Sequence, residues 1–180
     1  TLVMISSVIL FLANLDWKQI ILIGLVAALS FFVIIRVTTT GSTRWGQFIT
    51  GYNDPNLALT QVKRSIESVV NGGFFGVGIG QGTVKFTGLE VGQSDTIFTV
   101  IAEEAGLLGS IGVLVLYLLL LWRGFKIALE SEDMAGRLIA GGISSWIVLE
   151  AFINIASLFN IVPIGGNTLP FFSLGGSSLV

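Results

Sequence analysis

The stretch QIILIGLVAALSFFVII, residues 19–35, decides the fold class, because it holds no charged side chain and is bracketed by Lys18 and Arg36. Its length is close to the roughly 20 apolar residues that cross the hydrocarbon of a bilayer. Inside lipid, an isolated segment can satisfy its own backbone polar groups only as a helix. The stretch therefore predicts a transmembrane helix.

The composition extends this prediction to the whole chain. Hydrophobic residues make up 53% of the 180 residues and charged residues only 11%, whereas soluble domains carry roughly 25% charged residues. Two further apolar stretches, Ile97 to Trp122 and Leu138 to Phe159, are long enough to span, and Thr1 to Leu12 is about half a span. We predict an all-α integral membrane protein, a polytopic helical bundle.

The absence of cysteine and histidine limits the catalytic groups that the chain can offer. The chain has no cysteine and no histidine, which excludes disulfides and thiolate chemistry and removes the commonest proton shuttle and metal ligand. The nine basic residues are scattered and the net charge is -2, so nucleic acid is not an expected partner. Catalysis would have to use carboxylates, lysine, arginine or hydroxyls.

The order of segments predicts three regions. Residues 1–36 read as transmembrane helices, the first of them truncated, and residues 95–180 as further transmembrane helices. Between them, residues 37–94 form one large loop with an amphipathic helix at 57–70 and a glycine-rich run at 71–82. The run does not fit the dinucleotide-binding pattern G-x-G-x-x-G, so we expect backbone packed at the membrane interface instead.

Four acidic residues lie in or beside the apolar stretches. Asp95 precedes one of them, where a carboxylate can cap a helix N-terminus. Glu103 and Glu104 lie on different faces of the same stretch, so at most one is expected to point into a shared polar cavity. Glu150 and Asn154 are one helical turn apart and predict a polar patch that faces other helices. For the intramembrane groups, structural and functional roles both remain open.

The last part of the chain carries a family signature. It comprises Pro163, Gly165, Leu169-Pro170-Phe171, Ser173 and Gly175-Gly176-Ser177-Ser178, preceded by Trp146-Ile147, Asn154-Ile155 and the run from Ile101 to Gly109. In order and spacing these residues closely resemble the SEDS family, the RodA, FtsW and SpoVE proteins of bacterial cell-wall synthesis.

The resemblance implies a fold and an activity. It implies roughly the last five of about ten transmembrane helices of a multi-pass protein of the bacterial plasma membrane, with loop 37–94 extracellular. The implied activity is a glycosyltransferase that polymerises lipid II, a disaccharide on undecaprenyl pyrophosphate, into peptidoglycan strands. A class B penicillin-binding protein is the implied partner. A lipid II flippase and a non-catalytic scaffold for a crosslinking enzyme are the alternatives.

The resemblance also implies a site. Asp95 occupies the essential acidic position of the family, and a general base is what the attacking sugar hydroxyl requires. Lys85 and Arg44 are expected to clamp the leaving pyrophosphate, which a divalent cation such as Mg²⁺ or Mn²⁺ could bridge to Asp95. The other residues expected to bind substrate are Glu103, Glu104, Asn154, Ser173 and Ser177. The chain departs from the family pattern at Glu90, Val91, Gln93, Thr96, Glu150 and Leu174.

Overall fold

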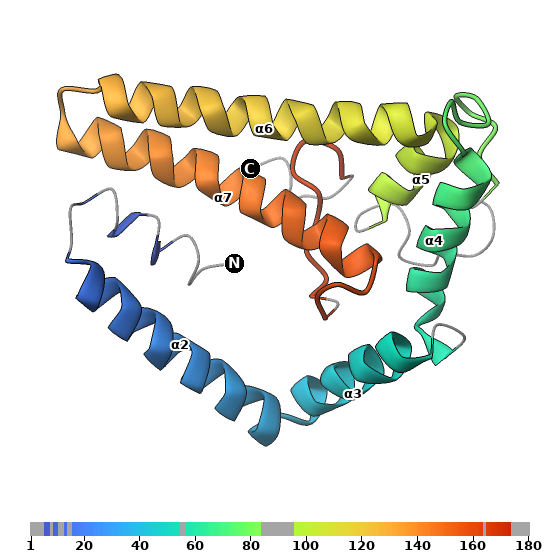
Figure 1. The fold of residues 1–180 in the computed structure, drawn as a ribbon, viewed down its shortest axis with the longest axis horizontal. Coiled ribbons are helices and arrows are strands. Elements are labelled where there is room, and N and C mark those ends of the chain that lie inside the picture. Colours follow the sequence, from blue (N-terminus) through green and yellow to red (C-terminus); the bar gives the residue numbers. More distant parts are fainter. Residues whose placement is uncertain are drawn as a thin grey trace. The chain divides into compact units, whose positions relative to one another are not determined.

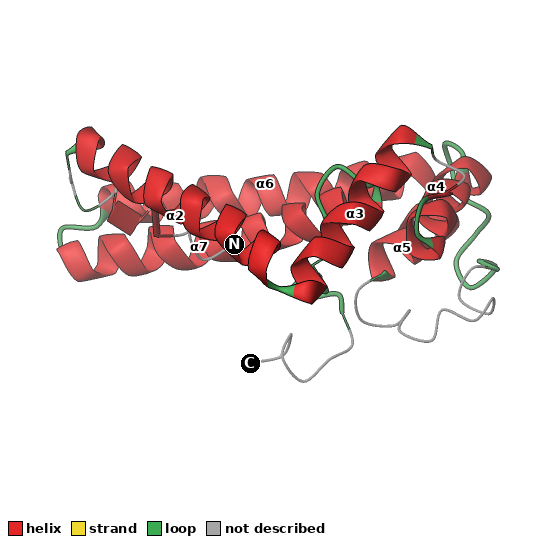
Figure 2. Ribbon diagram, turned by 90° about the horizontal axis from the view of Figure 1, so that it is seen from below, coloured by secondary structure: helices red, strands yellow, loops and turns green. Residues whose placement is uncertain are grey.

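The protein was analysed as a computed structural model, which describes residues 6–7, 9–10, 13, 16–54, 57–83, 96–163 and 165–173. These residues form six helices and no strand (Figures 1 and 2). The prediction of an all-α fold is therefore confirmed. In chain order the helices are α2 (Trp17–Val37), α3 (Thr39–Asn53), α4 (Thr60–Gly72), α5 (Ile97–Glu104), α6 (Gly106–Glu130) and α7 (Met134–Leu158).

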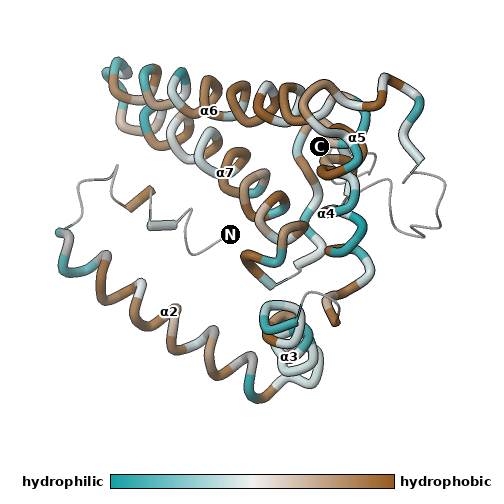
Figure 3. The backbone as a smooth tube through the Cα atoms, turned by 45° about the vertical axis from the view of Figure 1, so that its right-hand side comes forward, coloured by the Kyte–Doolittle hydropathy of each residue, from teal (hydrophilic) through white to brown (hydrophobic). Residues whose placement is uncertain are grey.

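Two helices of the described part of the chain, α6 and α7, are long and apolar enough to cross a membrane. Each has 25 residues, about 37 Å at 1.5 Å per residue. Their apolar character stands out in Figure 3. The helix predicted at residues 19–35 is confirmed as α2, of 21 residues, within which Ile21–Ser30 is a shorter apolar stretch. Its passage across the membrane stays a prediction.

The predicted span from Ile97 to Trp122 is wrong as one continuous helix, because the chain breaks at Ala105 into α5 and α6. The backbone N–H of Ala105 closes α5 by donating to the carbonyl of Ile101 at 2.9 Å. Gly106 then adopts a φ of 67°, in the left-handed region that commonly ends a helix. The spanning helix consequently begins at Gly106.

Helix α3 lies where the sequence predicted only loop. Its sequence contains three glycines and four threonines, residue types of low helix propensity, so no local preference marks it. Aromatic side chains follow one another along it, with ring centroids 5.7 Å apart for Trp45 and Phe48 and 6.4 Å apart for Phe48 and Tyr52. Spacings of three and four residues place these rings on one helix face.

Helix α4 confirms an amphipathic helix in the loop, with a different face packed inward. Its buried residues are small or short: Val62, Ser65, Ser68 and Gly72. The hydroxyl of Ser65 contacts that of Thr99 on α5 at 3.1 Å. The longer apolar side chains of Ile66 and Val70 are exposed. Small residues thus allow α4 and α5 to approach closely, as in membrane helix pairs.

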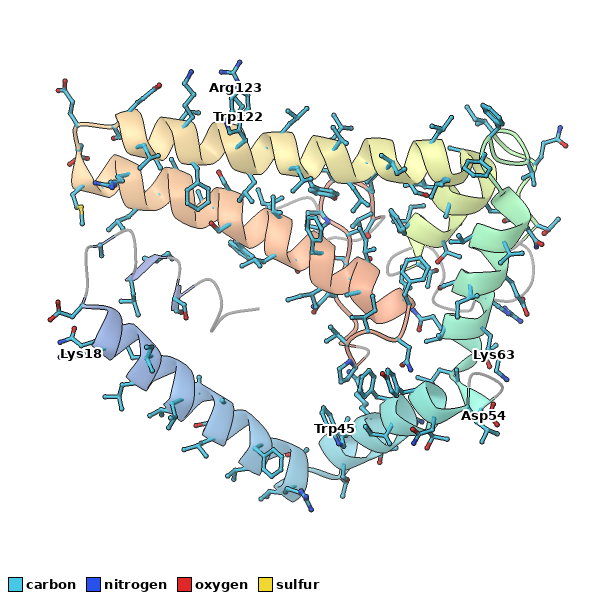
Figure 4. The ribbon with its side chains drawn as sticks, viewed as in Figure 1. Lys18, Trp45, Asp54, Lys63, Trp122 and Arg123 are labelled. Atoms are coloured by element: carbon cyan, nitrogen blue, oxygen red, sulfur yellow. The ribbon has the colours of Figure 1, made fainter. Side chains whose placement is uncertain are left out.

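The chain divides into two compact units. One contains Thr1–Thr43 and Tyr117–Leu149, and the other contains Arg44–Leu116 and Glu150–Val180. In the first unit, α6 and α7 pack so closely that a Cβ added to Gly124 would overlap the side chain of Ser144. On α6, the Arg123 guanidinium lies 5.5 Å from the centre of the Trp122 ring, and both side chains extend from the helix side that faces away from α7 (Figure 4).

Candidate functional site

The glycine-rich segment after α4 is fastened by its backbone to the break between α5 and α6. Figure 1 shows this loop folded beside the start of α6. The hydrogen bonds run in both directions: Val77 N–H to Glu103 O at 3.0 Å, Gly78 N–H to Glu104 O at 3.1 Å, Leu107 N–H to Gly73 O at 2.9 Å and Leu108 N–H to Phe74 O at 3.3 Å. The loop therefore satisfies backbone groups that the helix break leaves without a helical partner.

Two adjacent carboxylates hold the end of the same loop. Glu103 is 2% exposed, and its Oε1 accepts hydrogen bonds from the backbone N–H of Thr83 at 3.0 Å and from the Thr83 hydroxyl at 2.9 Å. Oε2 of Glu104 accepts from the backbone N–H of Gly80 at 2.9 Å. Each of the two carboxylates therefore has its own partner in the loop. Because α5 ends at Glu104, the loop can wrap the helix end and reach both faces.

Glycine is required where loop and helix break meet. A Cβ on Gly76 would overlap the carbonyl of Glu104, and a Cβ on Gly106 would overlap the backbone nitrogen of Gly76. Gly76 also has a φ of 80°, which L side chains rarely adopt. The contact is thus backbone against backbone, and the glycine run functions in close packing rather than in binding a phosphate.

The expected catalytic residue, Asp95, and the expected clamp Lys85 both lie outside the described residues, in segment 84–95. The described residues on either side of this segment are Thr83 and Thr96. Thr83 is bound to Glu103 of α5. Thr96 is 2% exposed and begins α5, its carbonyl accepting from the N–H of Thr99 at 2.9 Å. Both flanks of the segment are therefore attached to one helix of eight residues.

Asn154 and Ser173 each make a hydrogen bond within or to the stretch after α7. Asn154, buried on α7 as predicted, donates through Nδ2 to the carbonyl of Asn167. The hydroxyl of Ser173 accepts from the N–H of Leu169 at 2.7 Å, and Leu169 is itself fully buried. The described part of this stretch, residues 165–173, is not helical. Ser177 lies outside the described residues.

Arg44 is an exposed residue of α3 and lines a separate small cavity of about 80 Å³ with Gln47, Phe48, Leu59 and Asn160. Asn160 follows α7 and donates through Nδ2 to the carbonyl of Phe48 at 3.3 Å. Arg44 thus lies beside the joint between α3 and the end of α7, while Glu103 and Glu104 bind the glycine-rich loop.

Thr83 is the functional contact that the sequence did not reveal. Its partner Glu103 is 20 residues away, and a lone threonine after a glycine run carries no motif. The only signal was indirect: two acidic residues near the start of an apolar stretch require polar partners when they are buried.

The described residues do not form a metal site. Within residues 16–54, 57–83, 96–163 and 165–173, no three acidic side chains gather closely enough to hold an ion. The carboxylates of Glu103 and Glu104 are engaged by N–H groups of the loop. The divalent cation expected from the resemblance therefore has no ligand set among the described residues.

These features define a helical membrane protein in which a glycine-rich loop is fastened by two carboxylates to the broken start of a spanning helix. The family model described as "Cell cycle protein", for FtsW, RodA and SpoVE, matches residues 1–180. The chain belongs to this family, and the resemblance drawn from its motifs is confirmed.

Individual relatives agree with this assignment. Stage V sporulation protein E of Bacillus subtilis (strain 168) is 36% identical over 172 residues, 96% of this chain and 47% of the relative. The probable peptidoglycan glycosyltransferase FtsW of Geobacter sp. (strain M18) is 35% identical over 180 residues, 100% of this chain and 49% of the relative. This chain spans about half the length of the relatives that it matches.

A solved structure has the same fold. It matches 99% of this chain and 50% of its own, with a TM-score of 0.67 and 29% sequence identity. That structure concerns the structural coordination of polymerization and crosslinking by a peptidoglycan synthase complex. The likeness confirms the helical membrane fold for this chain.

Proposed function

We propose that this chain is part of a peptidoglycan glycosyltransferase that polymerises lipid II at the outer face of the bacterial plasma membrane. Support comes from the relatives, which carry the name of this activity, and from the similar chain of a peptidoglycan synthase complex. In this proposal, residues 37–94 lie outside the cell and residues 1–36 and 95–180 contain the membrane-spanning helices.

The proposed reaction forms one glycosidic bond and breaks one bond to pyrophosphate. The acceptor hydroxyl oxygen attacks the anomeric carbon of the donor sugar, and the undecaprenyl pyrophosphate leaves with the bonding electron pair. The hydroxyl proton passes to the carboxylate of Asp95 as general base. A single attack of this kind inverts the anomeric centre and requires no second carboxylate nucleophile.

The attachment of segment 84–95 at both of its flanks carries the proposal. Thr83 is held by buried Glu103, and Thr96 begins the same helix α5. A base must be held within hydrogen-bond reach of the proton that it removes, and Thr83 and Thr96, the described residues nearest to Asp95 on either side, both belong to or bind α5. In this proposal Glu103 and Glu104 act on the substrate through the loop that they position.

The remaining residues have secondary roles in the proposal. Lys85, two positions after the anchored Thr83, supplies positive charge to the departing pyrophosphate, and Arg44 on α3 contributes from the outer surface. Asn154 joins the stretch 165–173 to α7 and Ser173 closes a turn within it, and in this proposal both residues, together with Ser177, bind substrate. A divalent cation, if used, would depend on Asp95 and the pyrophosphate oxygens for its ligands.

The test is polymerisation of purified lipid II by the full-length protein carrying Asp95→Asn. Loss of a general base is expected to reduce the rate by roughly 10²–10⁴-fold. Glu67→Gln, an exposed carboxylate on α4, is the matched control and should keep normal activity. Unchanged polymerisation by Asp95→Asn would contradict the assignment. Lipid II translocation into the opposite leaflet without polymer formation would favour the flippase alternative.

We further propose a class B penicillin-binding protein as the partner, since the similar solved chain belongs to a complex that couples polymerization with crosslinking. Two measurements distinguish an enzyme from a scaffold: co-purification of the protein with this partner, and the rate at which the complex crosslinks peptidoglycan. If the chain were a scaffold alone, Asp95→Asn would leave both complex formation and the glycan product of the complex unchanged.

A further inference from the structure

The glycine-rich loop and α4 expose several large apolar side chains that the proposed catalytic role does not use. We call this set the apolar rim: Ile66, Val70, Phe74, Phe75, Val77 and Ile79. Ile79 is 92% exposed and Phe75 is 83% exposed. From Asn71 to Thr83 the chain has no charged residue, which is unusual for a loop of this exposure in water.

Much of the backbone beneath the rim is paired within the protein. Six N–H groups of the loop donate to protein acceptors: Gly76 to Gly72 O, Val77 to Glu103 O, Gly78 to Glu104 O, Gln81 to Gly78 O, Gly80 to Glu104 Oε2 and Thr83 to Glu103 Oε1. A loop in water can leave such groups to the solvent, whereas irregular backbone near lipid must pair them within the protein. The polar interior and apolar exterior match the second situation.

Helix α4 has the same arrangement. Its inward face holds Val62, Ser65, Ser68 and Gly72, while its apolar residues Ile66 and Val70 are exposed. Exposure of isoleucine and valine beside a buried face of mostly small residues is unusual for a helix that packs on a soluble core. It is typical of helices that face lipid.

The rim is also continuous with a spanning helix. Leu107 and Leu108, in the first turn of α6, donate to the carbonyls of Gly73 and Phe74. Both leucines are exposed, as is Ile111 one turn further on. The hydrogen bonds fix the rim at the depth of the first turn of α6, which is where a spanning helix enters the hydrocarbon.

We propose that the apolar rim inserts into the acyl chains of the leaflet in which α6 begins. Lipid is the occupant favoured by the uncharged sequence, by the pairing of six loop N–H groups within the protein and by the hydrogen bonds to the first turn of α6. Insertion would hold the loop, and with it the break between α5 and α6, at a fixed depth in the membrane.

Spin-label accessibility tests this insertion in full-length protein reconstituted in phosphatidylethanolamine and phosphatidylglycerol vesicles. Residues 1–180 contain no cysteine, so any cysteine elsewhere in the protein is replaced by serine and single labels are placed at Ile79→Cys and Phe75→Cys. Leu116→Cys, exposed on α6, is the control for lipid, and Glu132→Cys, exposed between α6 and α7, is the control for water.

Labels on the rim should collide with oxygen and lose collisions with water-soluble NiEDDA, as at Leu116. Free NiEDDA collision, as at Glu132, would overturn the proposal. Protection from both reagents would overturn it as well, because it would mean that protein, either another part of the chain or a partner, covers the rim. Because Ile79 and Phe75 are both highly exposed, either labelled variant alone can test the proposal if the other fails to fold.

Discussion

At the scale of single residues, Gly76 is where the loop depends most on the absence of a side chain. It has a φ of 80° and lies against the carbonyl of Glu104, whereas Gly80 has a φ of 84° and an added Cβ there would meet no atom within 4 Å. Both Ala variants should lose roughly 1–2 kcal/mol through backbone strain. Gly76→Ala should lose about 1–3 kcal/mol more through overlap.

Thermal unfolding of the two purified variants in detergent measures this difference. Gly80→Ala is the matched control, because it carries the strain without the overlap. Equal unfolding temperatures for the two variants would show that the loop does not rest on the end of α5.

The pair Thr83 and Glu103 offers a second residue-scale prediction. Thr83→Val removes the hydroxyl donor and Glu103→Leu removes the buried acceptor. Because hydrogen bonds to a carboxylate contribute about 1.5–3 kcal/mol, the double variant should be less destabilised than the sum of the single variants by a similar amount. Unfolding of all four proteins in a double-mutant cycle measures the coupling.

The control for this cycle is Thr43→Val paired with the same Glu103→Leu, since the Thr43 hydroxyl bonds only to Thr39 of its own helix among the hydrogen bonds described for it. That pair should be additive. Coupling below about 0.5 kcal/mol between Thr83 and Glu103 would contradict the anchoring of the loop.

The predictability of the site differs from residue to residue. Glu103 and Glu104 could be selected from sequence because acids beside an apolar stretch need polar partners. Their partners Thr83 and Gly80 could not be selected, since they lie 20 and 24 residues away along the chain and come close only in the folded protein. Asp95 was selected through the family resemblance, because a capping role and a catalytic role are indistinguishable from its local sequence alone.

At the scale of helices, the length of an apolar stretch predicted that a helix is present better than it predicted where that helix begins and ends. The stretches 19–35 and 138–159 correspond to α2 and α7, because long runs of apolar residues can satisfy their backbone in lipid only as helices. The break before α6 was missed although Gly106 was visible, since glycine is common inside membrane helices. Helix α3 was missed because its stability comes from contacts such as that of Asn160 with Phe48, not from local propensity.

The contact between α6 and α7 gives a prediction at this scale. A Cβ on Gly124 would overlap the side chain of Ser144, whereas a Cβ on Gly112 of the same helix would meet nothing within 4 Å. Gly124→Ala should therefore destabilise the protein by about 1–3 kcal/mol. Gly112→Ala is the matched control and should be neutral or stabilising by up to about 1 kcal/mol, the helix propensity difference.

Thermal unfolding in detergent compares these two variants, and a compensating change tests the cause. Ser144→Gly in the Gly124→Ala background removes the overlapping atoms and should restore most of the lost stability. No recovery would indicate that the two helices do not touch at this point.

At the scale of the molecule, the sequence predicted that the protein lies in a membrane rather than in water. It did not predict which helix faces pack against each other. The overall composition, 53% hydrophobic and 11% charged, decides the solvent of the protein. It does not decide that α4 buries serines and exposes isoleucine and valine. In lipid the hydrophobic effect no longer drives apolar side chains into the protein interior, so helix packing depends on shape and on polar contacts.

The orientation of the chain in the membrane is the remaining whole-molecule prediction. The loop between α6 and α7, Ser131 to Asp133, is flanked by Arg123, Lys126 and Arg137, and positive charge near short loops favours the cytoplasmic side. The large loop also carries basic residues, so the distribution of charge only weakly favours one orientation in the membrane. The proposed function, which requires the large loop to lie outside the cell, decides the orientation that we predict. Glu67 on α4 should therefore lie outside the cell and Glu132 inside.

Cysteine labelling in intact cells tests this orientation, with any cysteine outside residues 1–180 replaced by serine. A membrane-impermeant maleimide should label Glu67→Cys directly and Glu132→Cys only after the membrane is permeabilised; both positions are exposed, so protein burial does not limit the reaction. The opposite pattern would place the glycine-rich loop and segment 84–95 in the cytoplasm. Polymerisation at the outer face would then be impossible for this site, even if the fold and the loop anchoring were correct.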